Sequence, residues 1–220
     1  MARVLITREH AHPLAAMLEE LGHTSVHVPL IELAATNHGP PKTVPNAVLI
    51  TSQAVARFVP GLIQQIADAR VAAVGEATAS ALRNIGLEPH AIGSQGGLEA
   101  LRGLIGTVSG PIWYIGAERP SAGLAQALTD AGVERWTVYR NQRPEGYAAR
   151  LQQATADAVT FASGSAVDAY ADAVGKPSVR TAVLGESTAS RAAAHGFAVD
   201  AVAVEPSLQA LATAVSNALA

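Results

Sequence analysis

Residues 75–80 read Gly-Glu-Ala-Thr-Ala-Ser, and residues 185–190 read Gly-Glu-Ser-Thr-Ala-Ser. The two copies lie 110 residues apart, which is half the length of this 220-residue chain. The same offset relates Gly22 to Gly132. A chain with two similar halves predicts two similar lobes, and a cleft between such lobes is a favoured place for a small-molecule site.

Short apolar runs and helical patterns alternate on both sides of these copies. Leu14 and Leu18, like Leu124 and Leu128, are spaced as on one face of a helix. This alternation predicts an α/β fold, in which each lobe has a parallel sheet of about five strands flanked by helices. The expected strands are residues 4–7, 25–30, 47–51, 71–74, 89–92, 112–115, 136–139, 158–161, 181–184 and 199–202.

The composition is that of a globular protein, with 49% hydrophobic and 15% charged residues. The net charge of −3 argues against nucleic acid and acidic membranes as partners. Because the chain has no cysteine, disulfides, thiolate nucleophiles and cysteine zinc sites are excluded. The apolar run at residues 4–6 is too short for a signal peptide, so we expect a cytoplasmic protein.

No metal site is expected. His10 and His12 would share a face on a strand but diverge on a helix, and no third ligand is evident. Surface histidines are the better interpretation.

The loops after the expected strands have a common chemistry of Gly, Ser, Thr and helix starts. In parallel sheets, ligands bind at the carboxyl ends of strands. Glycine allows close backbone approach, and free N–H groups at helix starts favour anions, although the same residues are also ordinary helix caps. The expected substrate contacts are Thr7, Arg8, Ser52, Gln53, Gly75, Thr78, Gly116, Ser163, Gly164, Ser165, Gly185 and Thr188, and the loop 93–97 has similar composition.

Common catalytic motifs are missing. The Gly75 and Gly185 loops lack the lysine of a phosphate loop and the GxGxxG pattern, and the chain has no GxSxG elbow. Glu76 and Glu186 allow acid/base chemistry, but first-turn carboxylates that stabilise a helix dipole are the simpler reading.

Tyr139 ends the apolar run 136–139 and precedes the polar segment 140–144, which is typical of a linker. A tyrosine at such a junction either packs with its hydroxyl in water or has a functional role.

With these motifs the chain resembles the uroporphyrinogen-III synthases. The resemblance spans nearly the whole chain and depends on the order and spacing of individually weak motifs at residues 4–8, 22–23, 29–32, 50–52, 74–79, 138–140, 161–167, 184–189 and 206–211. It implies a discontinuous lobe of residues 1–34 plus 141–220 and an inserted lobe of residues 35–140, joined by a two-stranded linker, with the active-site cleft between them.

The resemblance also implies the reaction. Hydroxymethylbilane, a linear tetrapyrrole polycarboxylate, would lose water, invert its terminal pyrrole through a spiro intermediate and close to uroporphyrinogen III. Tyr139 would be the acid that assists water loss, and Ser52, Thr78, Ser163 and Thr188 would contact substrate. The resemblance implies a monomer that needs no cofactor or metal, with transient contact to hydroxymethylbilane synthase as its expected partner interaction.

One departure from the family concerns the second serine loop, where Gly164 stands in place of a common proline. Two other functions stay open at this stage. One is a non-catalytic two-lobed binding or sensor protein for an anionic metabolite, and the other is a nucleotide-dependent α/β enzyme, which the missing phosphate-loop lysine opposes.

Overall fold

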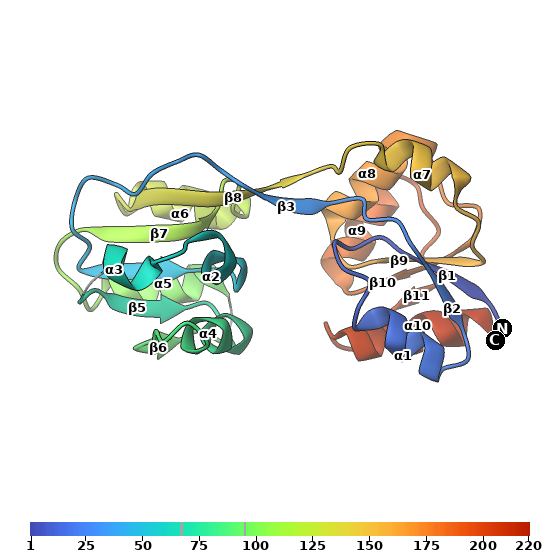
Figure 1. Cartoon of the computed structure of the whole chain (residues 1–220), viewed down its shortest axis with the longest axis horizontal. Coiled ribbons are helices and arrows are strands. Elements are labelled where there is room, and N and C mark those ends of the chain that lie inside the picture. Colours follow the sequence, from blue (N-terminus) through green and yellow to red (C-terminus); the bar gives the residue numbers. More distant parts are fainter. Residues whose placement is uncertain (67, 95) are drawn as a thin grey trace. The chain divides into compact units, whose positions relative to one another are not determined.

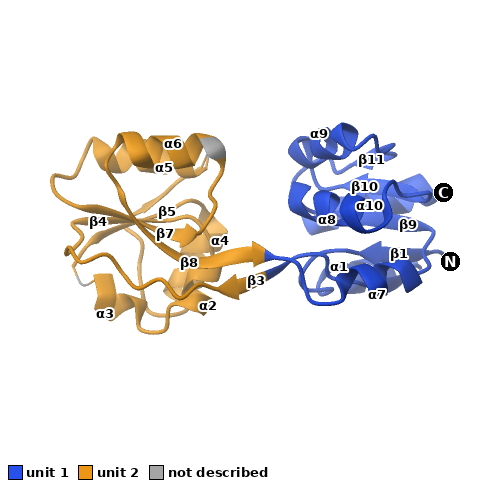
Figure 2. Cartoon of the chain, turned by 90° about the horizontal axis from the view of Figure 1, so that it is seen from above, with its two compact units in different colours: residues 1–32, 142–220 blue, residues 33–141 orange. Residues whose placement is uncertain are grey.

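Strands and helices alternate along the chain (Figure 1). The structure is a computed structural model that describes residues 1–66, 68–94 and 96–220. The chain divides into two compact units: unit 1 is Met1–Glu32 with Gln142–Ala220, and unit 2 is Leu33–Asn141 (Figure 2). The lobes expected from sequence are residues 1–34 plus 141–220 and residues 35–140.

Unit 1 contains a five-stranded sheet in the order β11-β10-β9-β1-β2, and all its neighbouring strands are parallel. Its strands are β1 (Arg3–Ile6), β2 (Thr24–His27), β9 (Ala158–Phe161), β10 (Arg180–Val183) and β11 (Ala201–Val202). Its helices are α1 (Leu14–Glu20), α7 (Tyr147–Gln153), α8 (Gly164–Val174), α9 (Glu186–Ala194) and α10 (Leu208–Leu219).

Unit 2 contains a sheet in the order β3-β8-β7-β4-β5-β6, in which the five strands from β8 to β6 are parallel. Its strands are β3 (Glu32–Ala35), β4 (Ala47–Ile50), β5 (Arg70–Ala73), β6 (Ala91–Ile92), β7 (Ile112–Ala117) and β8 (Glu134–Gln142). Its helices are α2 (Ala54–Phe58), α3 (Leu62–Ile66), α4 (Glu76–Arg83), α5 (Gly97–Ile105) and α6 (Ala122–Asp130). The predicted α/β class with parallel sheets is confirmed.

Strand β3 differs from the prediction, which has a single strand over residues 25–30 and none over 32–35. Gln142 Nε2 donates to Glu32 Oε1 at 2.8 Å, and the Thr36 N–H donates to the Val138 carbonyl at 3.1 Å. Rising numbers in β3 therefore face falling numbers in β8, so this edge pair is antiparallel. In β3, the apolar residues Leu33, Ala34 and Ala35 follow Glu32 without the longer run of the predicted strands, and the segment forms a strand by pairing with β8.

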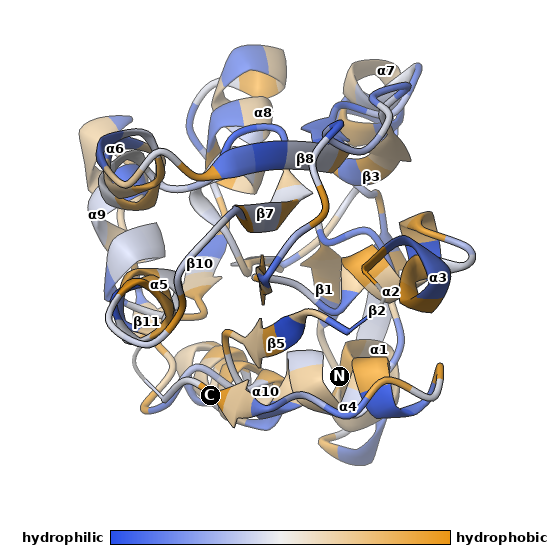
Figure 3. Cartoon of the chain, turned by 90° about the vertical axis from the view of Figure 1, so that its left-hand side faces the viewer, coloured by the Kyte–Doolittle hydropathy of each residue, from blue (hydrophilic) through white to orange (hydrophobic). Residues whose placement is uncertain are grey.

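Alternate residues of each strand face opposite layers of helices. In unit 1, Leu5 belongs to the core cluster that includes residues of α7, α8 and α9, whereas Val4 and Ile6 belong to the cluster that includes residues of α1 and α10. In unit 2, Ile50 packs with residues of α2, α3 and α4, whereas Leu49 packs with residues of α5 and α6. Each sheet is thus covered on both faces. Helices such as α1 and α3 carry both hydrophobic and hydrophilic residues (Figure 3).

Two glycines end equivalent helices, as the sequence predicts. Gly22 after α1 has a φ of 80°, and Gly132 after α6 has a φ of 63°. In each case the next residue donates its N–H back into the helix, from His23 to Leu18 and from Val133 to Leu128. This is the geometry in which glycine is favoured. Within the described ranges, no helix has the length and apolar character required to cross a membrane.

Candidate functional site

The predicted contact loops follow strands at the carboxyl edge of each parallel sheet. In unit 1 these strands are β1, β9 and β10, and in unit 2 they are β4, β5, β6 and β7. Because neighbouring strands are parallel, their loops gather at one edge of each sheet. The loop 93–97 is described only in part, since Gln95 lies outside the described residues; the Ser94 N–H donates to Glu99 Oε2 at 3.3 Å.

Tyr139 lies on β8 with a side chain that is 7% exposed. Its ring stacks on Phe58, with 5.7 Å between centroids and 22° between planes. Burial raises the pKa of Tyr139, and a hydrogen bond with the Ser52 side chain partly opposes this rise. The hydroxyl therefore keeps its proton at neutral pH, as a weak acid must.

Ser52, in the turn between β4 and α2, contacts both the backbone of that turn and the side chain of Tyr139. Its Oγ accepts the Ala54 N–H at 3.1 Å, while its side chain is bonded to Tyr139. Gln53, the residue before α2, has an exposed side chain. The structure thus brings Ser52 and Tyr139 together in unit 2.

Gly116 lies inside β7 rather than in the loop that the sequence predicts after residue 115, and it packs against two side chains. A methyl group at this position would be 2.6 Å from the Tyr114 hydroxyl and 2.7 Å from Thr51 Oγ1. The fully buried Tyr114 donates to the Ala117 carbonyl at 3.1 Å and accepts from Thr51 at 3.4 Å. Packing therefore accounts for this glycine without a ligand.

Gly75 and Gly185 are different, because neither backbone nor packing requires glycine there. Their φ angles of −179° and 179° are extended, which any residue adopts. A methyl group at Gly185 would meet no atom within 4 Å, and one at Gly75 would meet only the Gly93 carbonyl, at 3.9 Å. Each residue opens a helix, α4 or α9, next to free space where an anion can approach.

The three predicted threonines differ in position and in how their hydroxyls are bonded, since Thr7 follows β1 whereas Thr78 and Thr188 lie in the first turns of α4 and α9. Thr7 is fully buried, and its hydroxyl donates to the Thr160 carbonyl at 2.7 Å. Thr78 and Thr188 are each 4% exposed, and their hydroxyls have no hydrogen-bond partner among the described residues. Thr78 and Thr188 are thus available to a ligand, whereas the Thr7 hydroxyl is engaged within the sheet.

Arg8, directly after Thr7, has a buried guanidinium nitrogen. Nη1 is shielded from solvent and has no partner within the described part of the chain. Burial lowers the pKa of Arg8, although the nearby Glu9 opposes this. The group stays charged, since a guanidinium is effectively always protonated in proteins. A buried N–H without an acceptor is unfavourable until a ligand oxygen satisfies it.

The second serine loop is covered by an arginine. Ser163 Oγ accepts the Ala166 N–H at 3.4 Å as the cap of α8, and it lies 3.1 Å from Ser165 Oγ. A methyl group at Gly164 would lie 3.1 Å from Cγ of Arg191, whose guanidinium bonds both oxygens of Asp168. The Arg191 stem therefore occupies the space beside the loop that a larger residue at 164 would need.

The two repeated glutamates belong to no catalytic grouping among the described residues. Glu76 is exposed and pairs with Arg83 at 2.6 Å, which agrees with a helix-stabilising role. Glu186 is also exposed in the first turn of α9. In the described part of the chain, no group of three His, Asp or Glu side chains could hold a metal ion.

Three residues of these sites were missed by sequence reasoning: Phe58, Tyr114 and Arg191. The Tyr114-x-Gly116 spacing is a usable signal, because residues two apart on a strand share a face and a small partner leaves room for the ring. No local pattern predicts the contacts of Phe58 and Arg191, since each touches a residue distant in sequence.

Comparison with known proteins assigns the chain to a protein family. The model of the family described as Uroporphyrinogen-III synthase HemD matches residues 12–213. Among curated proteins, no sequence matches significantly.

Solved structures with the same fold include uroporphyrinogen-III synthetase from Helicobacter pylori, with a TM-score of 0.72, 17% identity and 100% of both chains covered. A mutant uroporphyrinogen III synthase from Thermus thermophilus has a TM-score of 0.66 and 20% identity, with 100% of this chain and 99% of that chain covered. At these identities the likeness shows the fold, and the family match carries the assignment.

Proposed function

This chain belongs to the uroporphyrinogen-III synthase family, and we propose that the hydroxyl and amide groups described above perform the family's reaction. That reaction is the cyclisation of hydroxymethylbilane to uroporphyrinogen III, with loss of water and inversion of the terminal pyrrole. The protein is accordingly a cyclising lyase of tetrapyrrole biosynthesis. The observation that carries the residue assignment is the protonated Tyr139 hydroxyl, buried against Phe58 and bonded to Ser52.

In this proposal Tyr139 donates a hydrogen bond or a proton to the departing hydroxyl. A buried phenol stays protonated at neutral pH, and its hydroxyl hydrogen strengthens its interaction as the oxygen gains negative charge. The C–O bond breaks, the hydroxyl leaves as water with the proton from Tyr139, and the pyrrole N–H releases a proton that restores the phenol as the azafulvene forms. The substituted carbon of the terminal pyrrole then attacks this electrophile, and the spiro intermediate rearranges before the ring closes.

Most of the catalysis in this proposal is positioning. Hydroxymethylpyrroles lose their hydroxyl readily, so the protein chiefly has to hold the bilane in the conformation that favours inversion over direct closure. The protein would hold the bilane in this conformation by binding its carboxylate groups.

We assign carboxylate contacts first to side-chain groups without a partner among the described residues and to helix starts beside free space. These are the hydroxyls of Thr78 and Thr188, the helix starts at Gly75 and Gly185, and Nη1 of Arg8. The loop residues Gln53, Ser163, Gly164 and Ser165 are proposed as further contacts. For Thr7 and Gly116 we propose backbone contacts only. The Thr7 hydroxyl is bonded within the sheet, and Tyr114 and Thr51 fill the space beside Gly116.

We also propose the division of the chain into two lobes that the sequence predicts. Two lobes, an inserted one of about residues 35–140 and a discontinuous one, are supported by the two points where the chain passes between units, at Glu32/Leu33 and Asn141/Gln142. A monomeric, cytoplasmic protein with transient contact to hydroxymethylbilane synthase remains a prediction.

The decisive experiment supplies the purified protein with freshly generated hydroxymethylbilane, oxidises the products and separates the type I and type III porphyrins. Type III in excess over a protein-free control establishes ring inversion. Spontaneous closure produces type I, so type I alone would contradict the proposal and favour a binding protein that keeps the fold without the activity.

A further inference from the structure

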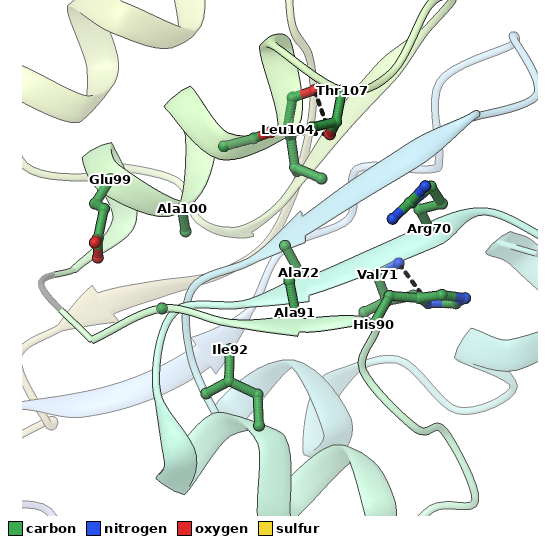
Figure 4. Close-up of a pocket in the computed structure, with 12 residues that line it drawn as sticks. Arg70, Val71, Ala72, His90, Ala91, Ile92, Glu99, Ala100, Leu104 and Thr107 are labelled. Atoms are coloured by element: carbon green, nitrogen blue, oxygen red, sulfur yellow. Dashed lines mark hydrogen bonds between the residues drawn. The ribbon is translucent and has the colours of Figure 1, made fainter.

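Unit 2 contains a pocket at the free edge of its sheet, where the short strand β6 and its neighbour β5 meet helix α5 (Figure 4). The cavity has a volume of about 300 Å³, which is at the lower end of the range for small-molecule sites. Its apolar walls include Ala72 and Ala91 of the strands and Leu104 of α5, whereas the Val71 side chain belongs to the core cluster on the other face of the sheet.

The equivalent place in unit 1 is neutralised within the protein. Arg180 Nη1 lies 2.8 Å from Asp200 Oδ1, and the Thr181 N–H donates to Asp200 Oδ2 at 2.8 Å. The repeat offset of 110 relates Arg180 to Arg70, and Asp200 to His90. The strand registers agree, because Ala182 pairs with Ala201 and Ala72 pairs with Ala91.

In unit 2 the carboxylate of this arrangement is replaced by an imidazole. The Val71 N–H donates to His90 Nδ1 at 3.2 Å, so this nitrogen is the unprotonated one and the neutral ring carries its hydrogen on Nε2. The Arg70 guanidinium has no hydrogen-bond or ion-pair partner among the described residues. One end of the pocket therefore offers a solvent-exposed guanidinium and imidazole N–H, with no acid bonded to either among the described residues.

The two basic side chains lie at the same end of the pocket, and Glu99 lies at the other end (Figure 4). A negative charge on the ligand is favoured near Arg70 and disfavoured near Glu99. Gly103, on the α5 wall, has no atom within 4 Å of the position that a methyl group would take. The glycine thus widens the space in which an apolar group can lie.

We propose that this pocket binds a small monocarboxylate with an aromatic or branched aliphatic body. The carboxylate accepts from Arg70 and from His90 Nε2–H, and the body packs on Ala72, Ala91 and Leu104. This site goes beyond the proposed enzymatic function and does not depend on it. A polycarboxylate such as a bilane is disfavoured here by Glu99.

Titration of the full-length, ¹⁵N-labelled protein with 2-naphthoate tests the proposal by NMR. We expect saturable shifts of the Ala91, Ile92 and Gly103 amides. The amides of Ala201 and Val202 in unit 1 serve as an internal control and should not shift, because Asp200 lies in the equivalent groove. Absence of saturable shifts at the pocket amides would overturn the proposal.

Related probes separate the chemistry of the ligand. Neutral 2-naphthalenemethanol and the dianion 2,6-naphthalenedicarboxylate should each bind about tenfold or more weakly than 2-naphthoate, since a charge-assisted hydrogen bond contributes roughly that factor. Equal binding of the alcohol would show an unspecific apolar groove. Inorganic phosphate that shifts the same amides as strongly would show an anion site without selection for an apolar body, and either result contradicts the proposal.

Three variants test the residues. Arg70→Gln should weaken 2-naphthoate binding about tenfold, His90→Asp should abolish it by recreating the Arg180–Asp200 arrangement, and Gly103→Leu should block the cavity. Arg102→Gln, which removes an exposed charge of α5 that does not line the pocket, is the matched control and should bind normally. Unchanged binding in folded Arg70→Gln and Gly103→Leu proteins would overturn the assignment.

Discussion

The hydroxyl of Tyr139 is hydrogen-bonded to the side chain of Ser52, a residue that follows a different strand of the same sheet. The bond fixes the direction of the phenol group, while the stack on Phe58 fixes the ring. A weak acid held at both ends is preorganised for a leaving oxygen. This pair leads to the first two predictions.

Tyr139→Phe should lower kcat by about 100-fold, the lower end of the contribution expected of general acid catalysis. Product affinity should change much less, because the variant keeps the ring and its packing. Steady-state turnover and product binding by fluorescence measure the two effects separately. A variant with full turnover would remove the acid role from Tyr139.

Ser52→Ala should raise the pKa of Tyr139 further, because the serine bond opposes the effect of burial. The tyrosinate absorbance of Ser52→Ala would then appear at higher pH, after subtraction of the spectrum of the same protein with Tyr139→Phe. Stability should fall by about 1 kcal/mol through loss of the Ala54 cap. An unchanged titration of Tyr139 in Ser52→Ala would contradict the hydrogen bond between Ser52 and Tyr139.

Gly185→Asp should preserve stability yet weaken substrate binding. Aspartate is a good helix cap and suits the positive end of the α9 dipole, and a Cβ atom at this position would meet no atom of the described residues within 4 Å. If a substrate carboxylate binds here, the added charge should raise KM about tenfold by like-charge repulsion. Gly185→Ser is the control of similar capping without charge. Equal KM values for the two variants would place the carboxylates elsewhere.

Gly116→Ala should destabilise unit 2 by about 1–3 kcal/mol, because the new methyl group clashes with the Tyr114 hydroxyl and Thr51 Oγ1. Urea unfolding measures the loss. In the background of Tyr114→Phe the clash is smaller, so the loss caused by Gly116→Ala should shrink. Strictly additive losses in the double variant would show that the Tyr114 hydroxyl is not the obstacle.

Asp200→Asn should destabilise the protein by about 1 kcal/mol at pH 7, through the charge-assisted bonds from Thr181 and Arg180. The Thr181 N–H, with help from Arg180, holds the pKa of Asp200 below its ordinary value against the effect of burial. A depressed carboxyl pKa stabilises the fold above the unfolded value of about 4, and this contribution disappears as pH falls through the folded pKa. The two proteins should therefore converge in stability in acid, and a difference that persists at pH 2 would contradict this origin.

The sequence by itself determined the class of the fold. Apolar runs alternate with helical patterns along the chain. Because a buried parallel strand must be apolar, the positions of β4, β9 and most other strands can be predicted from the sequence. The 110-residue repeat likewise identified Gly75 and Gly185 as equivalent loops. Strand β3 was not predicted from the sequence, because it is an edge strand whose formation depends on pairing with β8.

Only the tertiary structure decided which of these similar-looking groups are free to bind. Thr7 and Thr78 are both buried threonines near the carboxyl edge of a sheet, yet the Thr7 hydroxyl donates to the Thr160 carbonyl while that of Thr78, in the first turn of α4, has no partner among the described residues. Arg70 and Arg180 are copies of one residue, yet only Arg180 faces a carboxylate. Hydrogen-bond partners come from strands distant in the chain, so a local pattern supplies the chemical group and the packed fold determines whether that group is satisfied.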